Sequence, residues 1–215
     1  FQVHLQVDPA SFARMYNISQ AILGPALSVA TNSSVLFGKR LWAETRIALF
    51  EQAVDTRKPG HHLRESSARV SFGKRWVQKS VMEIYKEDVA RFRSLVGTDL
   101  DEDPMKALEN GRIPQLKALR LHNGTVYRWN RACYGTPVPG GSGKPHLRIE
   151  MRVMPSGPSI GDEIANAALW LGLMSELGAT MEDVTKHMEF DQAQANLYAA
   201  ARDGLAARFS WLDGE

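Results

Sequence analysis

The stretch HLRIEMRV, residues 146–153, alternates apolar and polar side chains without interruption. A period of two is typical of a β-strand that buries one face and leaves the other polar. Same-face side chains lie roughly 6.6 Å apart along a strand, so Arg148, Glu150 and Arg152 would form a row of cation, anion and cation. Such a row suits a charged ligand, and cross-strand ion pairing on a wet sheet face is the competing interpretation.

The opening segment FQVHLQV, residues 1–7, has the same period of two, with His4 between Gln2 and Gln6 on its polar face. Asp8 and Pro9 then give a helix-start signal. From Pro155 onward the chain is predicted to be helical, with Ser159 or Gly157 as a cap. Together these patterns predict an α+β fold, in which a mainly antiparallel, curved sheet has helices covering its apolar face.

The remaining elements are predicted from spacing and turn residues. Apolar periodicity predicts helices over residues 8–23, 41–53, 80–96 and 190–209. Alternation predicts strands over 116–122 and 125–131, with a tight turn at HNG between them. Loops are predicted for residues 31–40, 55–67, 97–114 and 132–145, and the third of these is expected to contain a helical turn around Met105 to Leu108. We see no linker that would divide the chain, so residues 1–215 are predicted to form a single domain.

Composition narrows the class of protein. The 215 residues are 44% hydrophobic and 23% charged, which is typical of a folded globular chain. The formal charge is +2 with the two signs interspersed, so neither nucleic acid nor an anionic membrane is expected as a partner. A single cysteine, Cys133, and the lack of a long apolar run favour the cytoplasm. A homo-oligomer stays possible at this stage.

The segment GGSGKP does not make a nucleotide-binding P-loop. That motif needs a glycine five residues before the Gly-Lys pair and a serine or threonine after it. Val138 occupies the first of these positions and Pro145 the second. If the chain binds a nucleotide, it does so by another arrangement.

Several segments resemble one family of ligases. HLRIEMRVMPSGP, followed by IANAALWLGLM, resembles the RIEVRFPDP strand and following helix of glutamine synthetases. It is more similar to the equivalent segment of the glutamate-cysteine ligase family, in particular its type-2 actinobacterial and plant-like members. FQVHLQV and ILGPALSVATNSS resemble the opening strand and helix of those enzymes, and RLWAETRIALFEQAVDTR and HNGTVYRWNR resemble later segments.

The resemblance implies a glutamine synthetase-like catalytic domain that joins a carboxylate to an amine with ATP. The implied reaction links the γ-carboxylate of glutamate to the amine of cysteine through an acyl phosphate, with Mg²⁺ as the cation. Two anions meet when a phosphoryl group moves onto a carboxylate, so such a site needs metal and guanidinium groups. The alternatives are a related ligase with another amine acceptor, or a ligase-like binding module that has lost turnover.

The resemblance also assigns roles on the strand 146–153. It implies that Glu150 is a metal ligand. It also implies that Arg152 is the catalytic arginine, which contacts the transferred phosphoryl group and the substrate carboxylate. It places Arg148 near the nucleotide phosphates. His4 lies where glutamine synthetases carry a histidine involved with metal or nucleotide, although the plant-like ligases have Asn in this strand.

Three further arginines are candidates for substrate or nucleotide binding. Arg46 matches an arginine that contacts the amino-acid substrate in related ligases, and ion pairing with Glu44 or Glu51 is the competing interpretation. Arg128 and Arg131 in TVYRWNR could also reach the site. Because they lie on opposite strand faces, only one of the two is expected to do so.

This sequence departs from the family pattern at one place. The fold begins with a glutamate-rich strand that carries further metal ligands, and no acidic residue precedes Asp8. The sequence therefore reads as the C-terminal portion of a ligase catalytic domain, with its N-terminal strand or strands upstream. On this interpretation we expect residues 1–215 alone to make no γ-glutamylcysteine, since Glu150 alone supplies few ligands for Mg²⁺.

Overall fold

The computed structural model describes residues 1–55, 68–97, 102–137 and 143–212 and combines helices with small sheets. Its main sheet has three antiparallel strands in the order β1 (Val3–Val7), β7 (His146–Met151) and β6 (Asn130–Gly135). β7 is the central strand and pairs with both neighbours. The predicted α+β class and the two predicted strands at 1–7 and 146–153 are confirmed by this arrangement.

The strand register aligns polar residues across the sheet. Glu150 on β7 lies opposite His4 on β1 and opposite Arg131 on β6. One pair further along, Arg148 lies opposite Gln6 and Cys133. Side chains directly opposite each other share a face, so the polar side chains of all three strands lie on one surface of the sheet.

The other surface of the sheet carries the hydrophobic core. Ile149 and Met151 on β7 and Ala132 on β6 have no exposed surface. Helix α1 (Phe12–Ala21) contacts both of these strands, and its Tyr16 hydroxyl donates a 2.9 Å hydrogen bond to the carbonyl of Asn130. Helices therefore cover the apolar face, as the alternation of HLRIEMRV predicts.

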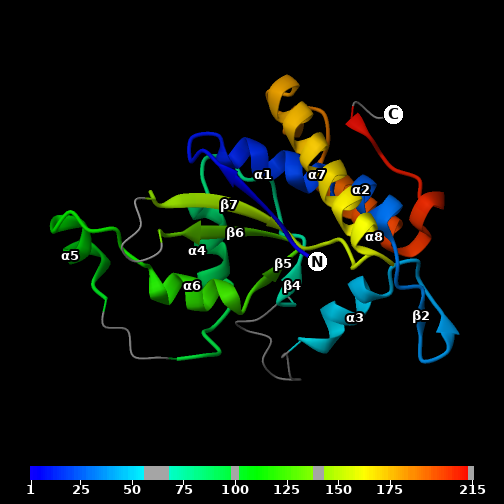
Figure 1. Cartoon of the computed structure of the whole chain (residues 1–215), viewed down its shortest axis with the longest axis horizontal. Helices are drawn as coiled ribbons and strands as arrows, with labels where there is room; N and C mark the ends of the chain where they lie inside the picture. The colour runs from blue at the N-terminus through cyan, green and yellow to red at the C-terminus, as the bar shows by residue number, and fades with distance from the viewer. Residues whose placement is uncertain (56–67, 98–101, 138–142, 213–215) are drawn as a thin grey trace.

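Four helices form one helical layer beside the sheet (Figure 1). They are α1, α2 (Leu23–Ala30), α7 (Ile160–Thr180) and α8 (Phe190–Asp203). A Cβ atom at Gly24 would lie 2.8 Å from the backbone of Asn196, so only glycine permits the close approach of α2 and α8. No helix within the described ranges is both long and apolar enough to cross a membrane.

The remaining elements are short and connect the layers (Figure 1). The strands pair as β2 with β3 and as β4 with β5, the latter pair being parallel. Their bounds are β2 Val35–Leu36, β3 Lys39–Arg40, β4 Val70–Ser71 and β5 Tyr127–Arg128. The other helices are α3 Arg46–Ala53, α4 Met82–Arg91, α5 Pro104–Glu109, α6 Lys117–Gly124, η1 Val184–Lys186 and η2 Gly204–Ala206.

The predicted strand at 116–122 is wrong, because Lys117–Gly124 is helix α6. Its Ala, Leu, Lys and Arg residues are strong helix formers, and alternation over so few residues does not exclude a helix. Tertiary contacts fix it: the His122 ring lies 2.7 Å from the carbonyl of Phe92, and Asn123 donates to the carbonyl of Ala132 at 2.8 Å.

Other boundaries shift as well. The predicted loop at 31–40 contains the β2–β3 hairpin, and the loop predicted from residue 132 begins as strand β6. The predicted helices 41–53, 80–96 and 190–209 are shorter, as α3, α4 and α8. The predicted helix 8–23 begins only at Phe12, and α2 then continues to Ala30. Most of the predicted loop 55–67 lies outside the described residues.

A buried ion pair joins α4 to β5. Asp88 accepts hydrogen bonds from Arg128 at 2.7, 3.0 and 3.2 Å, and both side chains are almost fully buried. Burial raises the pKa of Asp88, and the Arg128 cation opposes that effect. Removing one member of such a pair leaves an uncompensated charge in the interior.

We therefore expect Asp88→Ala to lower the free energy of unfolding by about 3 kcal/mol, because the buried Arg128 would lose its hydrogen-bonded counter-charge and keep only Glu87, which lies 3.4 Å away. Urea denaturation followed by circular dichroism measures this loss. Asp203→Asn is the matched control, since Asp203 and Arg202 form an exposed pair, and it should change stability by less than about 1 kcal/mol. Equal effects of the two substitutions would contradict the structural role of the Asp88 pair.

Candidate functional site

The polar face of the main sheet is built around the carboxylate of Glu150, which has no exposed surface. Arg131 donates to Oε2 of Glu150 through Nε at 2.7 Å, and its Nη2 lies 2.6 Å from the same oxygen. Nε of Arg152 lies 3.4 Å from the other oxygen, Oε1. A buried carboxylate needs such partners. The alternation of β7 and β6 places all three groups on one face.

Three atoms of this face are buried without a hydrogen-bond partner. They are Oε1 of Glu150, Nε of Arg148 and Nη1 of Arg152. Oε1 of Glu150 lies within ion-pair distance of Arg152 but outside hydrogen-bond geometry. Because buried polar atoms are normally paired, these atoms point to a ligand with both acidic oxygens and positive charge, such as a phosphate together with a cation.

His4 and Cys133 complete the surroundings of Glu150. One ligand atom from each of His4, Cys133 and Glu150 lies within 4.8 Å of the others, and the Cys133 sulfur donates to Oε2 of Glu150 at 3.3 Å. Burial lowers the pKa of His4, so its imidazole is neutral and able to accept at neutral pH. Burial raises the pKa of the Cys133 thiol to about 11, which makes it a poor nucleophile.

The donor atoms of Glu150, His4 and Cys133 differ in how well they suit Mg²⁺. Mg²⁺ prefers oxygen ligands and is commonly held by one or two carboxylates together with substrate phosphates and water. Oε1 of Glu150 has no hydrogen-bond partner and could therefore coordinate a cation. The imidazole of His4 and the thiol of Cys133 are softer ligands. Within this cluster of described residues, Oε1 of Glu150 is therefore the donor that could hold Mg²⁺, and phosphate and water would have to supply the other ligands.

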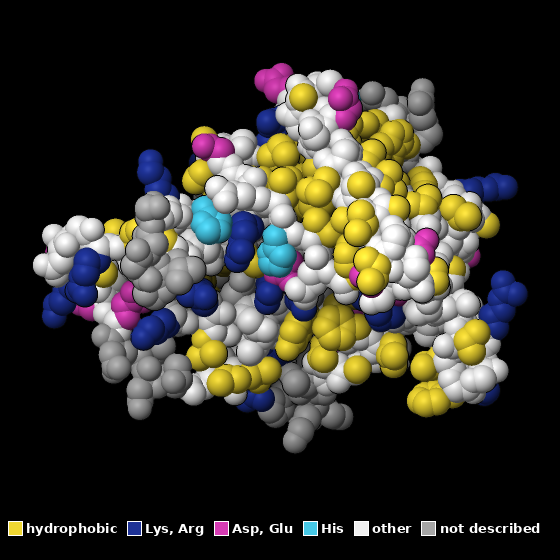
Figure 2. Space-filling view, in the orientation of Figure 1, with side chains coloured by type: hydrophobic (Ala, Val, Ile, Leu, Met, Phe, Trp, Pro, Cys, Tyr) yellow, Lys and Arg dark blue, Asp and Glu magenta, His cyan; other side chains and the backbone are white. Residues whose placement is uncertain are grey.

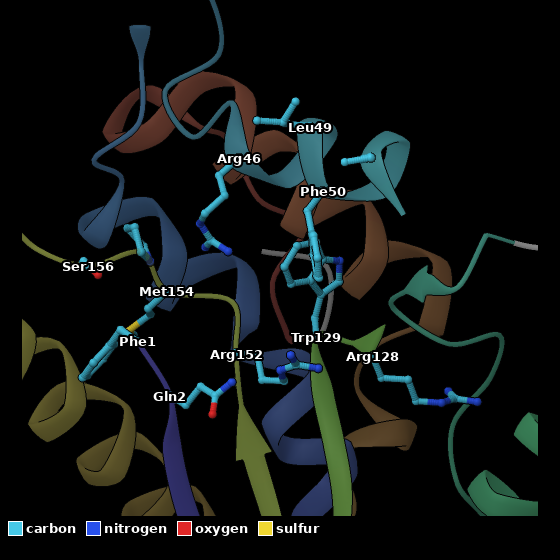
Figure 3. A pocket seen from close by; sticks show the side chains of 12 residues that line it. Phe1, Gln2, Arg46, Leu49, Phe50, Arg128, Trp129, Arg152, Met154 and Ser156 are labelled. Carbon is cyan, nitrogen blue, oxygen red and sulfur yellow. The ribbon is translucent and has the colours of Figure 1, made fainter. Parts of the chain in front are cut away.

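A cavity of about 420 Å³ adjoins the Arg152 end of β7. Figure 3 shows Arg46 entering it from α3 and Arg152 entering it from the end of β7. Its lining residues are Phe1, Gln2, Arg46, Leu49, Phe50, Ala53, Arg128, Trp129, Arg152, Met154, Pro155 and Ser156. On the molecular surface, basic and histidine side chains lie beside a patch of hydrophobic side chains (Figure 2).

Arg46 is fixed in place at the wall of this cavity. Its Nε donates to Oε1 of the fully buried Glu44 at 2.9 Å, and its Nη2 donates to the carbonyl of Val153. Its guanidinium also lies 5.8 Å from the ring centroid of Trp129, within cation–π distance. The predicted pairing with Glu44 therefore exists, and it orients Arg46 beside the cavity. Glu51 instead accepts a hydrogen bond from Tyr198.

The structure brings most of the predicted site residues together. Arg148, Glu150 and Arg152 form the predicted row, and His4 lies opposite Glu150. Of the two alternatives on β5 and β6, Arg131 contacts Glu150. Arg128 lines the cavity with part of its side chain, but its guanidinium is paired with Asp88 and extends away from the other labelled residues (Figure 3).

Sequence reasoning missed Cys133 and Trp129 as parts of this site. Cys133 lies opposite Arg148, a register that only strand pairing reveals. Trp129 is the aromatic residue between Arg128 and Asn130, where β5 ends and β6 begins. The alternation of residues 129–135 carried a signal for Cys133, because Arg131 and Cys133 share a face at spacing two.

Comparison with known proteins identifies one family. The family model described as glutamate-cysteine ligase family 2 matches residues 1–215, which is the whole chain. No curated protein and no solved structure gives a significant match. The family match agrees with the resemblance carried by the strand 146–153.

The burial of Glu150 makes a measurable prediction. Glu150→Gln should lower the free energy of unfolding by about 2 kcal/mol, because Arg131 and Arg152 lose their charged acceptor. It should also weaken Mg²⁺-dependent nucleotide binding, because a neutral amide is a poorer Mg²⁺ ligand. Denaturant unfolding and nucleotide titration with and without Mg²⁺ measure the two effects.

Glu176→Gln is the matched control, since it makes the same substitution at an exposed residue of α7, away from the polar face of the sheet. It should preserve Mg²⁺-dependent nucleotide binding. A loss of stability in Glu150→Gln with unchanged Mg²⁺ dependence would show that Glu150 is an ion-pair partner alone.

Proposed function

We propose that this chain, which belongs to glutamate-cysteine ligase family 2, works in an enzyme that uses ATP to join the γ-carboxylate of glutamate to an amine. The observation that carries the proposal is the buried Glu150 carboxylate between Arg131 and Arg152, with unpartnered atoms on Glu150, Arg148 and Arg152. Phosphate oxygens and a cation could satisfy these atoms, as buried polar groups normally require.

The proposed reaction has two steps. A carboxylate oxygen of glutamate attacks the γ-phosphorus of ATP, the bond to ADP breaks, and an acyl phosphate forms. The amine then attacks the acyl carbon, and phosphate leaves with the former carboxylate oxygen while the amine loses a proton. Negative charge accumulates on the phosphoryl oxygens in the first step, so donors fixed before the reaction lower its barrier.

The residues of the polar face have separable tasks in this reaction. Arg152 presents an unpartnered Nη1 to the transferred phosphoryl group, while its Nε stays near Glu150. Burial and the nearby Arg131 cation lower the pKa of Arg152, and guanidinium nevertheless stays charged at neutral pH. Arg148 lies four residues before Arg152, on the other side of Glu150, and its unpartnered Nε suits the other phosphates of the nucleotide. Arg131 orients Glu150.

Mg²⁺ would be held through Glu150, and when bound it would neutralise charge on the phosphates of ATP. His4 lies opposite Glu150, and its neutral imidazole could donate to a phosphate oxygen through one ring nitrogen and accept a hydrogen bond through the other. Arg46 is placed to hold the carboxylate of an amino-acid substrate in the adjoining cavity.

The proposal allows more than one amine acceptor. Cysteine is the acceptor that the family description names, and another amine is the alternative. A binding module without turnover is the third possibility, and it differs from both in releasing no phosphate.

The direct test uses the complete protein that contains this chain, with ATP, Mg²⁺, glutamate and a panel of amines. We expect ADP, phosphate and a γ-glutamyl amide in equal amounts, measured by coupled phosphate assay and mass spectrometry. Nucleotide binding without phosphate release under every condition would support the binding module and contradict the ligase.

Arg152→Lys tests the role of the guanidinium. Lysine keeps the charge and loses the planar pair of donors, so kcat should fall by about a hundredfold or more while ATP affinity changes only a few-fold. Arg40→Lys, at an exposed residue of β3, is the matched control and should leave both unchanged. Equal losses of kcat and ATP affinity would indicate that Arg152 contributes only to ground-state binding.

A further inference from the structure

We infer that His4, Cys133 and Glu150 form a binding site for a thiophilic divalent cation of the Zn²⁺ type, and that this cation competes with Mg²⁺ for Glu150. The binding site itself stands on the geometry of the three side chains. Its effect on nucleotide binding rests on the proposed function, in which Glu150 holds Mg²⁺.

The register of the main sheet brings three types of metal ligand together. His4 on β1 lies directly opposite Glu150 on β7, and Cys133 lies on β6 two residues beyond the partner of Glu150. One ligand atom from each side chain lies within 4.8 Å of the other two. Within the described ranges, no other three His, Cys, Asp or Glu side chains come this close. Paired strands hold such ligands more precisely than loops do.

The spacing suits a tetrahedral ion after a small movement of the side chains. Zn²⁺ bonds of about 2.0–2.3 Å place two ligand atoms of a tetrahedral site about 3.5 Å apart. The Cys133 sulfur already lies 3.3 Å from Oε2 of Glu150. His4 is exposed whereas Cys133 and Glu150 are buried, so the ion enters from the His4 side. Water or substrate takes the fourth position.

The donor set favours Zn²⁺ over Mg²⁺. Thiolate and imidazole are common Zn²⁺ ligands, whereas Mg²⁺ prefers oxygen. As the sulfur–metal bond forms, the Cys133 thiol releases its proton to solvent, and its raised pKa makes this release a cost of binding. Oε1 of Glu150 has no hydrogen-bond partner, so the carboxylate can bind a metal and keep its contact with Arg131 through Oε2.

The charges around Glu150 also separate the two cations. Arg131 and Arg152 both lie beside its carboxylate and repel any metal ion that approaches it. A thiophilic ion gains the negative charge of the Cys133 thiolate, which offsets this repulsion. Mg²⁺ gains no such charge from the protein and depends on the phosphates of a nucleotide. Zn²⁺ therefore occupies Glu150 without nucleotide and excludes Mg²⁺ from it.

The binding site is tested with Co²⁺, which replaces Zn²⁺ and absorbs light. The complete protein is titrated with Co²⁺ alone, and we expect the near-ultraviolet band that arises from charge transfer between a thiolate and Co²⁺. Cys133→Ser should abolish this band. His4→Gln should weaken Co²⁺ binding about tenfold or more, since even the outer partners of a metal site change its affinity by that amount.

His146→Gln is the matched control, because His146 lies on β7 outside the group of three ligands. It should change neither the band nor the affinity for Co²⁺. Because His4 is exposed, His4→Gln tests the site even if Cys133→Ser fails to fold, which circular dichroism shows.

Competition is measured by titrating the complete protein with ATP at fixed Mg²⁺, with and without Zn²⁺. With Zn²⁺ at about ten times its own Kd, mass action predicts about tenfold weaker Mg²⁺-dependent binding of ATP. In Cys133→Ser the same Zn²⁺ concentration should change this binding less than about twofold. Zn²⁺ also binds free ATP, and this contribution is equal for both proteins, so their difference reports the site.

A thiolate band that is absent from the unmodified protein, or that survives Cys133→Ser, would overturn the inference. Equal effects of Zn²⁺ on ATP binding by the unmodified protein and by Cys133→Ser would overturn the competition with Mg²⁺. A protein that shows the band, loses it in Cys133→Ser and forms no γ-glutamyl amide would support the metal site and contradict the proposed ligase. Turnover without the band would support the ligase and contradict the metal site.

Discussion

The rest of the site depends on one buried carboxylate, that of Glu150. It lies on the central strand β7, and its partners come from the neighbouring strand β6 through Arg131 and from its own strand through Arg152. A carboxylate with no exposed surface is stable only while these cations remain beside it. The same requirement fixes the cations, so the arginines are held in place before any ligand arrives. Preorganised charge of this kind is what phosphoryl transfer requires.

The sheet also determines the position of the cavity beside Arg152. β7 ends at Met151, and Arg152 follows at the point where the chain leaves the sheet for Met154 and Pro155. Helix α3 covers that point and brings Arg46, Leu49 and Phe50 to it. The polar row on the sheet therefore continues into a cavity that is lined by Arg46, Arg152 and apolar side chains.

Sequence reasoning recovered what depends on local periodicity. The alternation of residues 146–153 predicted β7, its buried face and the row of Arg148, Glu150 and Arg152. It did not recover what depends on pairing between distant segments. Residues 116–122 were predicted as a strand because a short alternation is ambiguous. Lys117–Gly124 is instead helix α6, which contacts with Phe92 and Ala132 hold in place. The choice of Arg131 over Arg128 as the partner of Glu150, and the presence of Cys133 beside them, follow from the β6–β7 register.

The central claim is that ATP activates a carboxylate at this site, and the transfer of an oxygen atom tests it most directly. The complete protein would be given glutamate labelled with ¹⁸O in its γ-carboxylate, together with ATP, Mg²⁺ and an accepted amine, and the released phosphate would be analysed by mass spectrometry. An acyl phosphate predicts one ¹⁸O atom in each phosphate released, because the carboxylate oxygen leaves with phosphorus. Unlabelled phosphate, or AMP and pyrophosphate in place of ADP and phosphate, would contradict the account.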